Sequence, residues 1–149
     1  MSGQRYEIGE MFNAMCEMTG LSRGELADVL MIRPSYLSSL KRGSKKVTTG
    51  RFTSVMELAS AHMTFRRDDL NIIMSTKHLS LKMMANMMLN FAKKRHDHAA
   101  QELGVTATYL SGCVNGSRPM QIEMLLAVAD MTGFSFTIAK TYGDKRGET

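Results

Sequence analysis

One stretch of this sequence gathers cations and excludes acidic side chains. Between Asp28 and Glu57 there is no carboxylate, while six positions carry Lys or Arg. They are Arg33, Lys41, Arg42, Lys45, Lys46 and Arg51. Guanidinium and ammonium groups bind phosphate oxygens, and a nearby carboxylate would repel the same phosphates. The stretch is therefore a candidate phosphate-binding surface, with a merely solvated charged loop at residues 41–46 as the alternative.

A second stretch, between Glu102 and Glu123, also lacks acidic residues but contains a single cation, Arg118. Its remaining polar side chains are small and neutral. We expect it to be a polar surface, less strongly attractive to phosphate than the first.

Other chemistry is hard to build from these residues. The run at 95–98, RHDH, has no second cluster to complete a metal site, and Cys16 and Cys113 have no metal-binding spacing. The sequence also lacks a glycine-rich phosphate loop, paired carboxylates and a nucleophile with a matching base. We therefore expect a non-enzymatic protein with no metal or cofactor.

The termini and composition favour a protein of the cytoplasm. Charges at Arg5, Glu7 and Glu10 occupy the place where a signal peptide would need an apolar run, and no stretch is long and apolar enough to cross a bilayer. The two cysteines form no disulfide framework, which favours a reducing compartment. We expect no membrane association.

The candidate residues lie on two short helices that the spacing predicts. Ser22 is the N-cap of the first helix, residues 31–33 are the turn, Pro34 opens the second helix and Gly43 ends it. The inward stripes are Leu26, Ala27 and Leu30, then Leu37 and Leu40. Spacings of four and three place Ser35, Ser39 and Arg42 together on the outer face of the second helix. This is helix-turn-helix geometry, in which the second helix enters the major groove of DNA.

The same plan occurs again 73 residues later. Tyr36, Leu37 and Ser38 fall on Tyr109, Leu110 and Ser111, and Gly43 with Ser44 falls on Gly116 with Ser117. Gly104 then lies in the predicted turn, and Thr108, Gly112 and Asn115 are expected to face outward. Further downstream, residues 55–63 align with residues 125–133 if three residues are inserted after Lys46. An amphipathic helical segment precedes each copy, and we expect the two halves to pack against each other.

The run GLSRGELADVLMIRPSYLSSLKRG resembles the helix-turn-helix of the lambda-repressor-like family, the Cro/C1 or XRE type of bacterial and phage regulators, and AAQELGVTATYLSGCVNG resembles it too. The resemblance implies that base edges are read by Arg33, Ser35, Ser39 and Thr108. It implies phosphate contacts from Arg23, Tyr36, Lys41, Arg42, Lys45, Lys46, Tyr109, Asn115, Ser117 and Arg118. Pro34 and Gly112 depart from the family pattern because neither offers a side-chain hydrogen bond. The two tyrosines could equally be half-buried packing residues.

From these features we predict an all-α fold of two tandem lambda-repressor-like helix-turn-helix units, with a possible short C-terminal β-strand. The expected organisation is an N-terminal domain at 1–72, a linker at 73–79, a C-terminal domain with the strand at 80–142, and a flexible tail at 143–149. Residues 134–142 alternate like a strand. A lone strand needs a partner, and the copy in a two-fold mate would supply it, so we expect a homodimer.

The expected function is sequence-specific binding of double-stranded DNA by a transcriptional regulator. The resemblance implies a repressor of a phage, plasmid or mobile-element operon, in a bacterial or phage-infected cell. Two alternatives remain. One is an antitoxin that binds its operator and a toxin protein through an exposed apolar patch, supplied by the Met-rich helix or the terminal strand. The other is an adaptor whose second helix-turn-helix binds protein instead of DNA.

Overall fold

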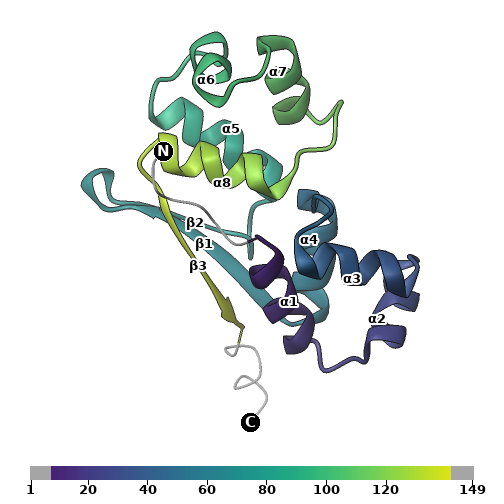
Figure 1. Cartoon of the computed structure of the whole chain (residues 1–149). Coiled ribbons are helices and arrows are strands. Elements are labelled where there is room, and N and C mark those ends of the chain that lie inside the picture. Colours follow the sequence, from purple (N-terminus) through teal and green to yellow (C-terminus); the bar gives the residue numbers. More distant parts are fainter. Residues whose placement is uncertain (1–7, 142–149) are drawn as a thin grey trace.

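The computed structural model describes residues 8–141 of the chain (Figure 1). The flexible tail expected at 143–149 lies outside the described residues. Within them, no helix has the length and apolar character needed to cross a membrane.

The first half forms four helices, and the second and third of them begin where Ser22 and Pro34 predict. They are α1 (Ile8–Met18), α2 (Arg23–Leu30), α3 (Pro34–Arg42) and α4 (Thr49–Leu58). Ser22 and Glu25 make a reciprocal capping box at the start of α2. Gly43 ends α3 in the left-handed conformation, with φ of 82°.

The second half repeats these helices with a constant offset. They are α5 (Leu81–Phe91), α6 (His96–Leu103), α7 (Ala107–Asn115) and α8 (Ile122–Met131). Each helix begins and ends 73 residues after its counterpart, α4 and α8 included. The three-residue insertion expected after Lys46 is therefore wrong, and the repeat runs without a gap.

The all-α prediction is also wrong, because a central three-stranded antiparallel sheet joins the two halves. Its strands are β1 (Ala61–Arg67), β2 (Ile72–Ser75) and β3 (Ser135–Lys140), in the order β2-β1-β3, with a short 3-10 turn at Asp68–Leu70. β1 and β2 form a hairpin, so residues 73–75 of the linker expected at 73–79 lie in a strand. Met63 and Phe65 are buried and alternate with less buried neighbours, the pattern of a half-buried strand.

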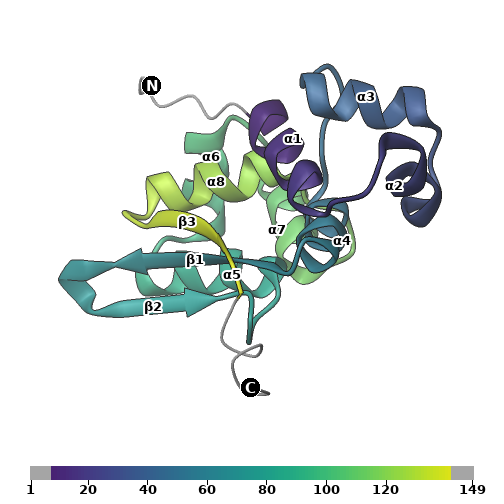
Figure 2. The same ribbon diagram turned by 90° about the horizontal axis from the view of Figure 1, so that it is seen from below.

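The sheet packs one face against the helices. Phe65 of β1 lies opposite Phe136 of β3, with ring centroids 6.0 Å apart, and opposite Met74 of β2. Figure 1 shows α5 and α8 above the sheet and α1 and α4 to its right. Seen from below, the β1–β2 hairpin projects away from α2 and α3 (Figure 2). The helices of both halves therefore pack against the same sheet.

The strand expected at the C-terminus is present as β3, but its partner is β1 of the same chain. Thr64 pairs with Thr137 at the middle of this ladder. The reason for expecting a homodimer, an unpaired strand in need of a mate, is therefore removed.

Candidate nucleic-acid interface

The outer face of α3 brings together the residues predicted to touch DNA. Arg33, Ser35, Tyr36, Ser39 and Lys45 line one open hollow of about 480 Å³, together with Ile32. Arg33, Ser35, Tyr36 and Lys45 are exposed and Ser39 is half-buried. Two hydroxyls thus lie among cations on a single helical face, as base and phosphate contacts require.

Hydrogen bonds within the first unit orient several of these side chains. The Ser39 hydroxyl donates to the Ser35 carbonyl (3.2 Å) and accepts from the Arg42 guanidinium (3.4 Å). Arg23 donates to the Ser38 hydroxyl across the α2–α3 contact (3.0 Å). Arg23 and Arg42 are therefore each held by a serine hydroxyl of α3, and both side chains are exposed.

Arg51 is a site residue that sequence reasoning counted as a charge but did not assign. Its guanidinium lies 6.0 Å from the centre of the Tyr36 ring and donates to the Leu30 carbonyl (3.4 Å). It therefore steadies both the end of α2 and the first turn of α3. The signal was its membership of the acid-free stretch.

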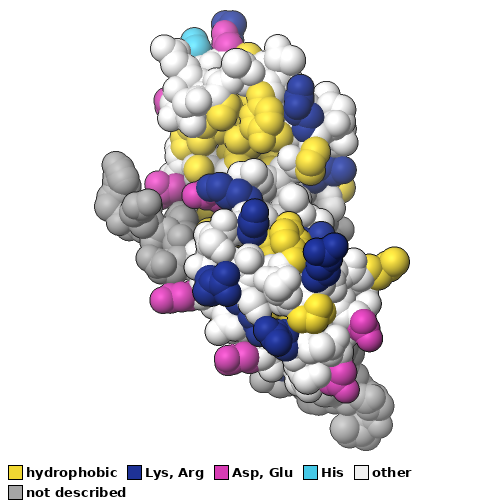
Figure 3. Space-filling model, turned by 45° about the vertical axis from the view of Figure 1, so that its right-hand side comes forward, with side chains coloured by type: hydrophobic (Ala, Val, Ile, Leu, Met, Phe, Trp, Pro, Cys, Tyr) yellow, Lys and Arg dark blue, Asp and Glu magenta, His cyan; other side chains and the backbone are white. Residues whose placement is uncertain are grey.

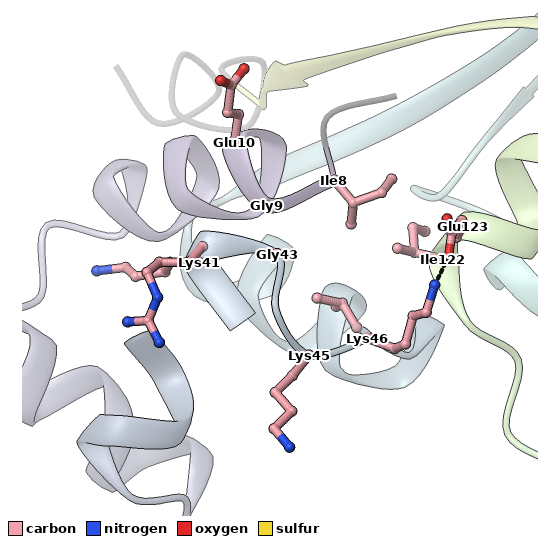
Figure 4. Close-up of a pocket in the computed structure, with 11 residues that line it drawn as sticks. Ile8, Gly9, Glu10, Lys41, Gly43, Lys45, Lys46, Ile122 and Glu123 are labelled. Atoms are coloured by element: carbon pink, nitrogen blue, oxygen red, sulfur yellow. Dashed lines mark hydrogen bonds and ion pairs between the residues drawn. The ribbon is translucent and has the colours of Figure 1, made fainter. Parts of the chain in front are cut away.

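Lys46 differs from the other predicted phosphate ligands because it already has a carboxylate partner. Its ammonium group forms an ion pair with Glu123 at the start of α8. Figure 4 shows Lys46 reaching Glu123 while Lys45 points away from it. Lys45 and Lys46 border a hollow of about 550 Å³ between the units, which Lys41, Gly9 and Ile122 also line. Lys45 and Lys41 remain the stronger candidates for phosphate contact on this side.

The outer face of α7 forms a second hollow of about 470 Å³. Thr108, Asn115, Ser117 and Arg118 line it and are exposed. Gly112, expected to face outward, is buried under the side chains of Arg118 and Ser117. An ideal Cβ on Gly112 would lie 3.0 Å from Cδ of Arg118 and 3.2 Å from Oγ of Ser117. The missing side chain of Gly112 leaves room for Arg118 to cross the helix.

Tyr109 illustrates how the second unit uses its tyrosine. It is half-buried, and the Arg118 guanidinium lies 5.6 Å from the centre of its ring. Burial raises the pKa of the Tyr109 phenol, with Cys113 contributing in the same direction. Tyr109 is thus positioned to support Arg118, whereas Tyr36 is more exposed.

Lys82 adds a cation to the second unit that sequence reasoning did not find. An ideal Cβ on Gly116, the C-cap of α7, would lie 2.9 Å from the Lys82 ammonium nitrogen. Lys82 is exposed at the start of α5, beside a hollow that it lines with Arg118. Lys82 lies far from Gly116 in the sequence, which hid this proximity. The repeat contained a signal, because Lys82 is the 73-residue counterpart of Gly9, which borders the end of α3.

Charge on this face of the molecule is uneven (Figure 3). Lys and Arg side chains gather over the α1–α4 half, and fewer appear on the α5–α8 half.

In the run at 95–98, Arg95 pairs with Asp97 (3.0 Å) and His96 contacts the Ser111 hydroxyl (3.1 Å). Residues 8–141 contain no cluster of His, Cys, Asp or Glu able to hold a metal ion.

Comparison with protein-family models, with curated proteins and with solved structures finds no match for the chain.

Proposed function

We propose that the chain is a sequence-specific, double-stranded DNA-binding transcriptional regulator that inserts α3 and α7 into the major groove. The observation that carries this proposal is the outer face of α3. There Ser35 and Ser39 lie between Arg33 and Lys45 in one hollow. Among the described residues, neither cation forms an ion pair with a carboxylate. Such a face attracts a polyanion and also offers hydroxyls for base edges.

The roles divide by chemistry. Lys41, Arg42 and Lys45 bind phosphates and fix the register of α3, because their charges carry no sequence information. Ser35 and Ser39 contact base edges, where hydrogen bonds discriminate between base pairs. In the second unit Thr108 touches bases, and Asn115, Ser117 and Arg118 hold the backbone. The biological context that fits best is repression of a phage, plasmid or mobile-element operon, as the family resemblance implies.

The test is selection of bound duplexes from a random pool by the purified protein at near-physiological salt. We expect one enriched motif. Ser35→Ala with Ser39→Ala should relax the preference at specific bases, at about 0.5–1.5 kcal/mol for each lost hydrogen bond. Lys45→Ala should weaken binding to all sequences equally and reduce the salt slope by about one.

Arg66→Ala is the matched control, since it removes an exposed cation in β1, on the hairpin that projects away from α2 and α3. Its affinity should equal that of the unaltered chain. If no motif is enriched, or if Arg66→Ala and Lys45→Ala weaken binding alike, the DNA-binding proposal fails and the protein-partner alternatives take its place.

Those alternatives depend on exposed apolar surface. The segments expected to supply it are largely turned inward: Met84 and Met88 of α5 are buried, and Phe136 and Ile138 of β3 lie on the inner face of the sheet. Co-purification of a small protein partner would favour the antitoxin alternative. Retention of full affinity after Thr108→Ala with Asn115→Ala would favour the adaptor.

A further inference from the structure

We propose that this single chain is a built-in pseudo-dimer: one copy binds one inverted-repeat DNA site, with α3 on one half-site and α7 on a different one. The inference rests on the proposed DNA-binding function. It specifies the class of site and the stoichiometry. It follows from a two-fold relation between the halves that the backbone hydrogen bonds display.

The first sign of two-fold symmetry is a pair of reciprocal hydrogen bonds at the junction of the halves. The Thr49 amide donates to the Met120 carbonyl (2.7 Å), and the Ile122 amide donates to the Val47 carbonyl (2.8 Å). Met120 and Ile122 are the 73-residue counterparts of Val47 and Thr49. Each half therefore gives the other the bond that it receives, which defines an isologous contact.

The second sign is the register of β1 and β3. Thr64 pairs with Thr137, its own counterpart at an offset of 73. In an antiparallel ladder, a residue pairs with its own equivalent only where a two-fold axis passes between them. The Thr64–Thr137 pair and the Thr48–Gln121 bridge, another equivalent pair, mark two points on the same axis.

The third sign is an exchange of side chains at the ends of these strands. Lys140 of β3 donates to the Ala59 carbonyl at the end of α4 (2.9 Å), and Arg67 of β1 donates to the Thr132 carbonyl at the end of α8 (3.1 Å). These two contacts are also equivalent at the offset of 73. The strand of each half therefore caps the last helix of the other half, and the exchange is reciprocal.

A two-fold axis has a definite consequence for DNA. Halves related by translation would read a direct repeat, whereas halves related by a two-fold axis read an inverted repeat, because B-DNA has its own two-folds perpendicular to the helix axis. Figure 1 shows α3 to the right of the sheet and α7 at the top of the molecule, above α8. The half-sites should be centred about one helical turn, roughly 34 Å, apart.

The two half-sites should not be identical, because the outer positions differ. Arg33 corresponds to Thr106, Ser35 to Thr108, Ser39 to Gly112 and Arg42 to Asn115. A conventional homodimer would read the same half-site twice. The pseudo-dimer reads an imperfect palindrome in which the half-site of α3, with more cations around it, contributes more of the affinity.

The decisive experiment makes the two helix faces alike. The variant Thr106→Arg, Thr108→Ser, Gly112→Ser, Asn115→Arg gives α7 the outer residues of α3. At Gly112 the new side chain must displace Cγ and Cδ of Arg118 and Oγ of Ser117 by a few tenths of an ångström, and all three are side-chain atoms. Duplexes from a random pool are selected with each protein, and native mass spectrometry then counts chains on the enriched duplex. We expect an inverted repeat of unlike half-sites for the unaltered chain, a true palindrome for the variant, and one 16.6-kDa chain per duplex in both cases.

The reverse variant, Arg33→Thr, Ser35→Thr, Ser39→Gly, Arg42→Asn, gives α3 the outer residues of α7 and keeps the test decisive if the first variant does not fold. It should select a palindrome of the other half-site. A direct repeat, a single sub-site, or two chains per duplex would overturn the pseudo-dimer and leave DNA binding intact. Failure of the unaltered chain to enrich any motif would overturn the DNA-binding function itself.

Discussion

Gly9 is the position where a single methyl group should disturb this fold most informatively. It lies in the first turn of α1, pressed against the end of α3. An ideal Cβ there would lie 2.7 Å from the Gly43 nitrogen, 2.8 Å from the Lys41 oxygen and 2.9 Å from the Arg42 carbonyl carbon. All three are backbone atoms, so no side chain can rotate away to make room for alanine.

The size of the effect follows from this geometry. Ordinary contact begins at 3.4 Å, so the closest pair must separate by a further 0.7 Å, and α1 must shift against α3 as a unit. Overpacking of this kind costs about 1–3 kcal/mol, against a gain of at most about 1 kcal/mol from replacing glycine in a helix. We expect Gly9→Ala to lower the free energy of unfolding by about 1–2 kcal/mol, which for a chain of this length lowers Tm by about 2–8 °C.

Gly24→Ala is the control, since it is also a helical glycine but its Cβ would meet no atom within 4 Å. It should raise the free energy of unfolding by about 0.5–1 kcal/mol. Chemical denaturation followed by circular dichroism measures both variants. If Gly9→Ala is as stable as Gly24→Ala, the close approach of α1 to α3 is not a feature of the folded protein.

Three further predictions concern strain, ionisation and the junction of the units. Met31 ends α2 with φ of 61° and is 88% exposed, so Met31→Gly should stabilise the protein by about 1 kcal/mol in a thermal melt. Gly104 has φ of 77° at the counterpart position, and Gly104→Ala should destabilise the protein by a similar amount. Burial raises the pKa of the Cys16 thiol from 9.0 to about 11. The unfolded thiol therefore loses its proton first, and the stability that the neutral thiol contributes should be present below pH 9 and decline towards pH 11; a Cys16→Ala chain measured in parallel should lack that part of the decline. Lys46 and Glu123 are 62% and 56% exposed, so a double-mutant cycle by denaturation should give a coupling below about 1 kcal/mol that shrinks with added salt; a larger value would mean that the pair fastens the units together.

The helices around α3 were predictable because their signals are local. Ser22 marks the start of α2, Pro34 the start of α3 and Gly43 the end of α3. Each acts through backbone groups within a few residues of itself. The structure places all three as expected. The residues of the α3 face were predictable for the same reason, since helical spacing alone puts Ser35 and Ser39 on one side.

The sheet was missed because its signal is non-local. The segment at 61–67 contains His62, Arg66 and Arg67, and its strand character depends on burying Met63 and Phe65 against distant helices. The repeat nevertheless held the missing information. At an offset of 73 this segment falls on residues 134–140, which alternate clearly enough to be predicted as a strand. The assumed insertion after Lys46 concealed this correspondence. Lys82 and Arg51 belong to the same class, because only tertiary packing brings them to the helices that they support.

The way in which the two halves differ supports assigning their functions to α3 and α7. Buried counterparts are often the same residue: Met15 and Met88, Ala27 and Ala100, Leu37 and Leu110, Val55 and Val128. Left-handed turns recur at equivalent places even where the residue changes, as with Ser60 and Gly133. The buried residues and the turns are therefore suited to the same backbone conformation in both halves. Two outer pairs differ in charge, Arg33 against Thr106 and Arg42 against Asn115, and all four side chains are exposed, so packing does not fix them. The exposed faces of α3 and α7 can therefore differ without cost to the fold, as the proposed reading of two unlike half-sites requires.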